Sequence, residues 1–173
     1  LQADSLKPFF DRALMAKYPP GSIFKPVLSL IALEEEILTT NRYIRCNGAY
    51  YYKIYRWGCH AGPGVHNVTG AIEKSCNTIF YTVYRELVDR FGFDNPEKGL
   101  NQLSGHLNKF GLGKSLEIDL PSENPGLIPN SDFYDDFYEG KGDWRSTYII
   151  SNGIGQGEVE LTTLQMANLA AII

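Results

Sequence analysis

The sequence predicts a mainly helical domain, because helical periodicity recurs along the chain and convincing strand patterns are scarce. Apolar residues return every three or four positions in several stretches, which is typical of helices that bury one face. These stretches lie at about 22–33, 68–91, 95–110 and 162–173. Pro121, Pro125 and Pro129 interrupt the region before the last helix, so we expect residues 115–150 to form loops with short extended pieces.

The first helix is predicted to follow a strong turn signal, Tyr18–Gly21, and to begin at Ser22. Residues 1–17, before this turn, are expected to form a loosely structured lead-in. The helix is expected to end at the acidic run of residues 34–36. Its apolar face comprises Phe24, Val27, Leu28, Ile31 and Leu33.

Residues 41–66 are expected to be irregular, because they are rich in glycine and contain Pro63. Within them, Tyr50–Tyr55 could pair as a short hairpin. The long helical pattern at 68–91 carries one buried stripe, with Gly92 as its C-terminal cap. A break in this pattern near Ser75 is left open.

Two further helices have marked ends. Asn95-Pro96 predicts a start, because proline is favoured at the first helical position, and Gly111 predicts the end of that helix. In the last helix, Thr162 and Gln165 match a capping box, in which each side chain satisfies an unpaired backbone N–H.

Charge and hydrophobicity exclude two classes of protein. The net charge is −4 without a basic cluster, so we expect no nucleic-acid binding. Hydrophobic residues make up 43% of the chain, but no apolar run approaches the length of a membrane span. Because the chain starts at Leu1 and stops at Ile173 within a helical pattern, we interpret residues 1–173 as a single partial domain, truncated at both ends.

The first candidate site is Ser22 with Lys25, one helical turn apart and therefore on one face. A serine hydroxyl becomes a good nucleophile when an adjacent base takes its proton, and a buried lysine can be that base. The alternative is a helix-capping serine with a solvated lysine. That alternative fits less well, because a cap favours an acidic residue or glutamine where Lys25 stands.

The second candidate is Ser75 with Asn77. Both side chains can point into one site only if the helix is interrupted there; otherwise they lie on the solvent face of a continuous helix. Cys76 falls on the apolar stripe, and we interpret it as a small buried residue.

The third candidate is the glycine-rich segment Asn152–Glu158, in which Gly153, Gly155 and Gly157 alternate with other residues. Such glycines bring the backbone close to another group. The pattern matches neither a dinucleotide fingerprint nor a phosphate loop. A tight turn that enters the last helix is the competing interpretation.

The fourth candidate is a group of thiols and imidazoles, Cys46, Cys59, His60 and His66. Zn²⁺ favours four nitrogen or sulfur ligands, although this spacing matches no standard finger. A Cys46–Cys59 disulfide and unlinked thiols are equally compatible with the sequence.

Taken together, three segments resemble class B penicillin-binding proteins. Tyr18–Pro26 is similar to their first motif, Ser-x-x-Lys, and Ser75–Tyr81 to their second, Ser-x-Asn. Gly153–Glu158, followed by Leu161–Ala167, resembles a stretch that the family carries just afterwards. The resemblance spans nearly the whole chain and is closest to the elongation-specific branch.

The resemblance implies the helical part of an α/β transpeptidase fold, with most of the sheet missing from this sequence. It implies that Ser22 attacks the penultimate D-Ala carbonyl of a peptidoglycan stem peptide, with Lys25 as the base. Ser75 and Asn77 would hold Lys25 and the substrate amide, and Gly155, Gln156 and Gly157 would line the substrate site. It further implies β-lactam binding, no cofactor, and a membrane-anchored parent that works with the elongation machinery on the periplasmic side.

The family's third motif, Lys-Thr-Gly, is not found in this sequence. In the family its strand supplies one oxyanion donor, and losing such a donor costs about a hundredfold or more in rate. We therefore expect the 173-residue chain alone to turn over no peptide substrate. Two alternatives stay open: a β-lactamase or β-lactam sensor, and a non-catalytic helical interaction domain.

Overall fold

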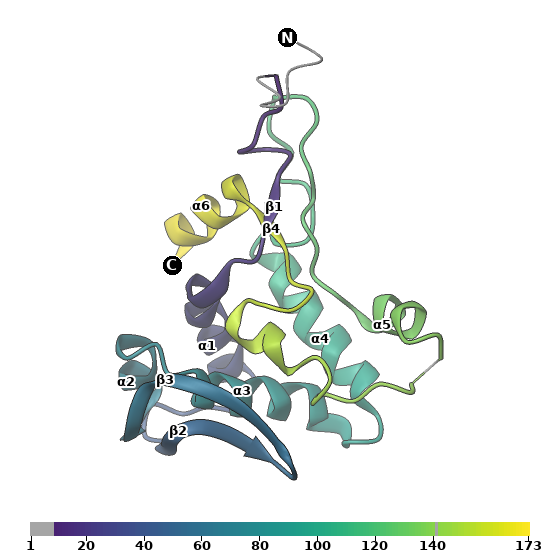
Figure 1. Cartoon of the computed structure of the whole chain (residues 1–173). Helices are drawn as coiled ribbons and strands as arrows, with labels where there is room; N and C mark the ends of the chain where they lie inside the picture. Colours follow the sequence, from purple (N-terminus) through teal and green to yellow (C-terminus); the bar gives the residue numbers. More distant parts are fainter. Residues whose placement is uncertain (1–8, 141) are drawn as a thin grey trace.

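The computed structural model describes residues 9–140 and 142–173. Helices dominate these residues, and two small two-stranded sheets accompany them (Figure 1). In chain order the elements are β1 (Lys17–Tyr18), η1 (Gly21–Phe24), α1 (Lys25–Glu34), β2 (Ile44–Tyr52), β3 (Tyr55–His66), α2 (Val68–Glu73), α3 (Asn77–Val88), η2 (Asp89–Phe91), α4 (Pro96–Lys109), α5 (Ser131–Phe137), η3 (Ile150–Ile154), β4 (Leu161–Thr162) and α6 (Thr163–Ile172). The mainly helical prediction is confirmed.

Helix α3 is the centre of the core. It contacts α1, α4, η3 and the β2–β3 hairpin. Phe80, Val83 and Val88 on α3 are fully buried. Gly99 lets α4 approach the end of α3, because a side chain there would come within 2.2 Å of the Val88 carbonyl oxygen.

Three predicted helices are confirmed with small changes at their ends. The first opens with the 3₁₀ turn η1, so that α1 itself begins at Lys25, one turn after the expected start at Ser22. Helix α4 starts at Pro96 as expected. Helix α6 carries the predicted capping box, in which the Gln165 N–H donates to Thr162 Oγ1 over 3.2 Å.

The long pattern at 68–91 is interrupted, so the break near Ser75 is real. Helix α2 ends at Glu73, α3 begins at Asn77, and a 3₁₀ turn completes the stretch before Gly92. Ser75 lies between the two α-helices with a φ of +51°.

The irregular structure expected for residues 41–66 is wrong for most of that stretch. Strands β2 and β3 form a long antiparallel hairpin, which pairs Ile44 with His66 at one end and Tyr52 with Tyr55 at the other, so the short hairpin considered at Tyr50–Tyr55 is present. The register shifts between Asn47 and Ala49, so the strands continue past an irregularity at Gly48. Aromatic cross-strand packing such as Tyr50 against Trp57, with ring centroids 5.8 Å apart, supports the pairing.

The prediction of loops with short extended pieces for residues 115–150 is also wrong in one place. Helix α5 occupies Ser131–Phe137, and the Asn130 side chain caps it by accepting from the Phe133 N–H over 2.9 Å. Tyr134 on this helix is fully buried. Seven residues are too few for a periodicity argument, so the cap was the available signal.

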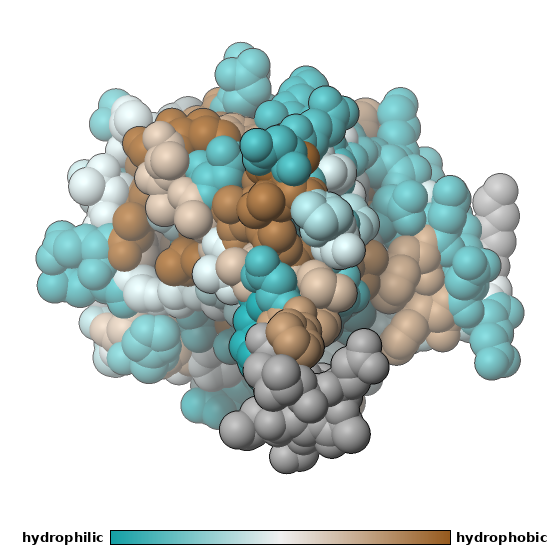
Figure 2. All heavy atoms as spheres, turned by 90° about the horizontal axis from the view of Figure 1, so that it is seen from above, coloured by the Kyte–Doolittle hydropathy of each residue, from teal (hydrophilic) through white to brown (hydrophobic). Residues whose placement is uncertain are grey.

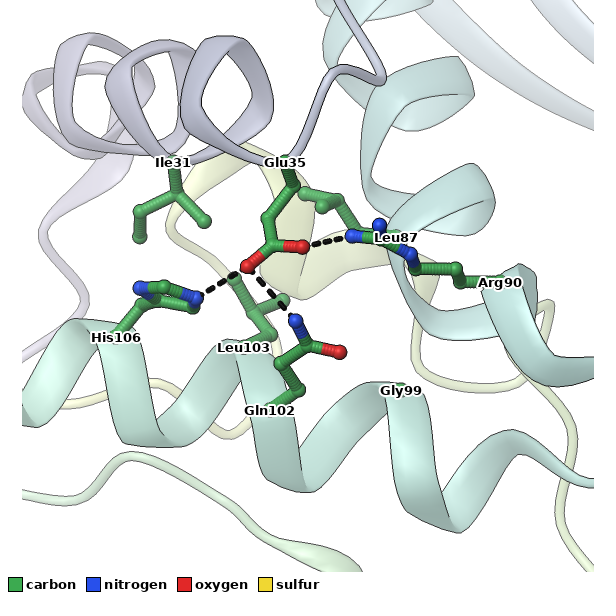
Figure 3. Close-up of a pocket in the computed structure, with 8 residues that line it drawn as sticks. All are labelled: Ile31, Glu35, Leu87, Arg90, Gly99, Gln102, Leu103 and His106. Atoms are coloured by element: carbon green, nitrogen blue, oxygen red, sulfur yellow. Dashed lines mark hydrogen bonds and ion pairs between the residues drawn. The ribbon is translucent and has the colours of Figure 1, made fainter.

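A cluster of polar side chains joins the end of α1 to α4 and η2 (Figure 3). Glu35 accepts from Gln102 Nε2 over 2.7 Å, lies 2.5 Å from His106 Nε2 and pairs with Arg90. The cavity here measures only about 10 Å³, so it has no room for a substrate. We therefore interpret the cluster as a structural tie between the helices.

Helix α6 buries only part of its apolar surface. Gln165 and Leu169 are its buried residues, and Ile172 is 54% exposed. A groove of about 270 Å³ lies between α6 and the start of α1, lined by Ile23, Pro26, Met166, Leu169, Ala170 and Ile173. Figure 2 shows hydrophobic surface among polar surface on the face seen from above.

Gln165 is expected to contribute strongly to stability. Its fully buried Nε2 lies within hydrogen-bond distance of the carbonyl oxygens of Gly111, Lys114 and Pro125. Gln165→Leu would leave these acceptors unpaired, which should lower the free energy of unfolding by about 2–3 kcal/mol. Urea unfolding of the protein measures this. The exposed Gln156→Leu is the matched control, and equal midpoints for the two variants would contradict the prediction.

Candidate active site

Ser22 and Lys25 have opposite exposure although they lie on one turn. Ser22 is in the 3₁₀ turn η1 and is exposed to solvent. Lys25 is the first residue of α1, and its side chain is directed into the protein, with 1% of the residue exposed. The first candidate pair therefore combines an accessible hydroxyl with a buried amine.

The Lys25 amine has a full set of partners from the second candidate pair. Nζ donates to the Ser75 carbonyl oxygen over 2.8 Å, to Ser75 Oγ over 2.9 Å and to Asn77 Oδ1 over 2.7 Å. A protonated lysine has three N–H donors, and these three contacts use all of them. The solvated lysine considered from the sequence is therefore wrong.

Ser75 connects this amine to Ser22. Ser75 Oγ lies 3.0 Å from Ser22 Oγ and 2.9 Å from Lys25 Nζ, so one hydroxyl bridges the two groups. Within the described part of the chain, Ser22 and Lys25 share no direct hydrogen bond. The sequence placed the two on one face, but the structure connects them through a residue 50 positions further along the chain.

The break between α2 and α3 makes this arrangement possible. The left-handed conformation of Ser75, which costs on the order of 1 kcal/mol in a residue other than glycine, reverses the chain before α3. As a result, Ser75 and Asn77 both face Lys25, although they are only two residues apart. The alternative of a continuous helix with both side chains in solvent is wrong.

Two further contacts position Asn77 and Lys25. Asn77 Nδ2 donates to the Gly58 carbonyl oxygen of β3 over 3.3 Å, which fixes the orientation of the amide. Lys25 Nζ lies 5.5 Å from the centroid of the buried Phe80 ring. Burial lowers the pKa of Lys25 from its ordinary value of 10.5, and the neighbouring Cys59 and Cys76 thiols oppose this shift.

A family model described as the penicillin binding protein transpeptidase domain matches residues 2–173. The chain belongs to this family. Relatives called peptidoglycan D,D-transpeptidase MrdA include those of Acinetobacter baumannii, 32% identical over 171 residues, and Escherichia coli, 31% identical over 174 residues. These matches cover 96% and 98% of the chain but only 23% and 25% of the relatives, so the chain spans about a quarter of their length.

Solved transpeptidases confirm the fold. Pseudomonas aeruginosa PBP2, in complex with WCK 5153, is 26% identical with a TM-score of 0.82, over 99% of this chain and 37% of that one. Helicobacter pylori PBP2, in complex with MreC, is 27% identical with a TM-score of 0.81, over 96% of this chain and 29% of that one. The chain is thus a homologue of the elongation-type transpeptidases, and the likeness covers part of their fold.

Three cysteines of this chain gather beside the site. The sulfur atoms of Cys46, Cys59 and Cys76 all lie within 4.8 Å of one another. His60, which the sequence suggested as a further ligand, is exposed and does not belong to the group. Cys76 is the third member of the group instead, because the break at Ser75 directs the Cys76 side chain toward β3.

The thiols differ in chemistry. Burial raises the pKa of Cys59, but hydrogen bonds from the Thr78 and Ala61 amides outweigh it and bring the pKa to about 7. Burial raises the pKa of Cys76 to about 12. Cys59 Sγ and Cys76 Sγ are 3.7 Å apart, Cys46 also hydrogen-bonds to Cys59, and all three thiols are free. Three thiols could also supply three of the four ligands that Zn²⁺ prefers.

The glycine-rich segment lies against the other side of the Ser22 turn. Gly155 is buried, whereas Gln156 and Gly157 are exposed. The Gly155 carbonyl oxygen accepts from the Gly21 N–H over 2.7 Å. The sequence therefore located a close backbone approach correctly, but it could not show that the approaching group is the residue before Ser22.

Proposed function

We propose that this chain carries the nucleophile and the base of a peptidoglycan D,D-transpeptidase. The observation that supports the proposal is the connection from buried Lys25 through Ser75 to exposed Ser22. A hydroxyl within reach of a base, itself oriented by other groups, is the arrangement that nucleophilic catalysis requires. The similarity to MrdA proteins, which are peptidoglycan D,D-transpeptidases, supports this choice of reaction.

The proposed first step is acylation of Ser22. Neutral Lys25 takes a proton from Ser75, which takes the proton of Ser22, while Ser22 Oγ attacks the penultimate D-Ala carbonyl carbon. The bond to the terminal D-Ala nitrogen breaks, and that nitrogen leaves with the proton returned from Lys25. An amine of a neighbouring stem peptide then attacks the ester carbonyl carbon, the bond to Ser22 Oγ breaks, and the proton lost by the amine returns to Ser22 through Lys25 and Ser75.

Asn77 has a positioning role in this proposal. Its Oδ1 accepts from Lys25, and its Nδ2 is turned toward the Gly58 carbonyl. The amide thus keeps Lys25 aimed at Ser75. In the complete site, we propose that Asn77 also contacts the substrate amide, with Gly155, Gln156 and Gly157 near the substrate.

The complete reaction requires more protein than this chain. The third motif would come from a part of the domain not contained in the 173 residues. We propose that the whole protein is anchored to the inner membrane and acts on the periplasmic side. None of the described helices is long and apolar enough to span a bilayer.

The proposed partners are β-lactams and proteins of the cell-elongation machinery. A related PBP2 from Helicobacter pylori was solved in complex with MreC. A related PBP2 from Pseudomonas aeruginosa was solved in complex with WCK 5153. Both structures match nearly the whole of this chain, which supports the same kinds of partner for it.

The direct test is covalent labelling of the protein that carries the complete transpeptidase domain. A fluorescent penicillin is expected to form a stable adduct, and mass spectrometry of the digest should place it on Ser22. Slow release of the adduct indicates a transpeptidase. Rapid turnover of nitrocefin would indicate a β-lactamase instead, and no adduct at Ser22 would refute the proposal.

A further inference from the structure

The glycine-rich segment at the end of η3 contacts both elements that carry the catalytic groups. Gly155 lies against η1, which holds Ser22, and Gly153 lies against α3, which begins with Asn77. We propose that Gly153 and Gly155 are positioning residues that set the separation of these two elements, and with it the Ser22–Ser75 contact. The inference rests on the proposed serine acylation.

The contact between Gly155 and η1 is too close for any side chain. A Cβ atom at Gly155 would come within 2.3 Å of the Gly21 carbonyl oxygen, 2.9 Å of the Gly21 nitrogen and 2.8 Å of the Phe24 Cβ. Two of these atoms are backbone, so no rotamer change would relieve the clash. Gly155 also has a φ of +67°, which disfavours other residues.

Gly153 makes the equivalent contact with α3. A Cβ atom there would come within 2.6 Å of the Tyr84 Cβ and 2.9 Å of the Phe80 carbonyl oxygen. Phe80 is the residue whose ring lies beneath Lys25. Two glycines only two positions apart thus allow one short segment to touch η1 and α3 at backbone distance.

A buried polar network holds this segment in place. Asn152 Nδ2 donates to the Tyr134 hydroxyl over 2.5 Å and lies 3.3 Å from the Tyr84 hydroxyl. Asn152 Oδ1 accepts from the Glu158 N–H over 3.1 Å, and the Tyr134 hydroxyl donates to the Glu158 carboxylate over 2.8 Å. These contacts connect both ends of the glycine-rich segment to α3 and α5.

The network is internal to the protein. Asn152 is 2% exposed, Tyr84 2% and Tyr134 0%. Burial raises the pKa of both tyrosines, so they stay protonated and can donate. A segment held by buried hydrogen bonds on one side is rigid enough to fix the position of η1 on the other side.

Substitution of Gly155 should therefore reduce catalysis by moving Ser22. Gly155→Ala must push η1 away by roughly 1 Å to restore ordinary contact, and a displacement of that size at a reacting atom costs up to about 100-fold in rate. We expect the acylation rate constant for a fluorescent penicillin to fall about 10- to 100-fold. The dissociation constant of the initial noncovalent complex should change little.

The experiment uses the complete transpeptidase domain and three matched variants. Gly92→Ala is the control for backbone strain, because Gly92 has a φ of +113° and a Cβ atom added there would meet no other atom within 4 Å. It should acylate at the wild-type rate. Tyr134→Phe keeps the ring but loses the hydroxyl contacts, and we expect it to slow acylation about threefold to tenfold.

Two readouts separate this inference from the proposed function. Acylation reports on both, whereas hydrogen exchange of the Gly21 amide reports only on its bond to Gly155. We expect the Gly21 amide to be protected in the wild type and to exchange faster in Gly155→Ala. If the wild type formed no covalent adduct but the Gly21 amide still exchanged faster in Gly155→Ala, the proposed function would be refuted. The contact between Gly155 and Gly21 would stand.

The positioning role would be overturned if the melting temperature of Gly155→Ala showed that it is folded and its Ser22 was nevertheless acylated at the wild-type rate. It would also be overturned if Gly21 exchange were equal in the two proteins. Should Gly155→Ala fail to fold, Tyr134→Phe decides: unchanged acylation in that variant would refute the positioning role.

Discussion

Ser22→Ala is expected to abolish covalent labelling by β-lactams completely. Ser22 Oγ is the exposed hydroxyl of the group, and the fully buried Lys25 amine is held away from solvent by three hydrogen bonds. Without this oxygen no ester can form. Noncovalent binding should persist, because alanine removes one atom and leaves η1 in place.

The control for this variant is Ser115→Ala, a serine that is exposed and hydrogen-bonded to Glu123 far along the chain from Ser22. It should be labelled like the wild type. Labelling intensity on a gel and the mass of the intact protein measure both variants. A covalent adduct that persists in Ser22→Ala would show that another residue is the nucleophile.

Lys25→Met is expected to lower the acylation rate constant by about 10²- to 10⁴-fold, the usual contribution of a general base. Methionine nearly fills the buried volume of the lysine but can accept no proton from Ser75. It also leaves Asn77 Oδ1 without its donor. We therefore expect slow labelling with little loss of initial binding.

The pH profile supplies a second measurement for Lys25. Only the neutral amine can accept a proton, so acylation should rise with pH and level off once Lys25 is deprotonated. Because burial lowers its pKa, the plateau should begin below the ordinary value of 10.5. Lys109→Met is the control, since Lys109 lies at the end of α4 and is not hydrogen-bonded to Ser22, Lys25 or Ser75. Acylation by Lys25→Met at the wild-type rate would exclude Lys25 as the base.

Much of the secondary structure follows from local sequence. The capping box at Thr162, the proline at the start of α4 and the turn before Ser22 each act within a few residues, so their residue types suffice to predict them. Helix α5 escaped prediction because it is a single short element. The short hairpin considered at Tyr50–Tyr55 is present, but most of the length of β2 and β3 escaped prediction because glycines near an irregularity in strand pairing look like those of a loop.

The candidate site was predictable in its parts but not in its connections. The spacing of Ser22 and Lys25 predicted that they lie on the same turn. The sequence also showed that Ser75 and Asn77 can share a site only if the helix is broken there. Both inferences depend on local geometry alone. The family resemblance implied that Ser75 and Asn77 hold Lys25 and relay protons, but residue spacing alone could not predict that Ser75 bridges Lys25 and Ser22, because that position depends on where α3 packs against α1. The grouping of Cys76 with Cys46 and Cys59 depends in the same way on the position of β3.

By itself the sequence determined the mainly helical character, most helix ends and the residue types needed for serine acyl transfer. Those properties depend on dihedral preferences and on spacing within one or two helical turns. Only the tertiary structure decided that Lys25 reaches Ser22 through Ser75, and that Gly155 touches the residue before Ser22. The physical reason is that these contacts join segments 50 or more positions apart, which meet only when the core around α3 is packed.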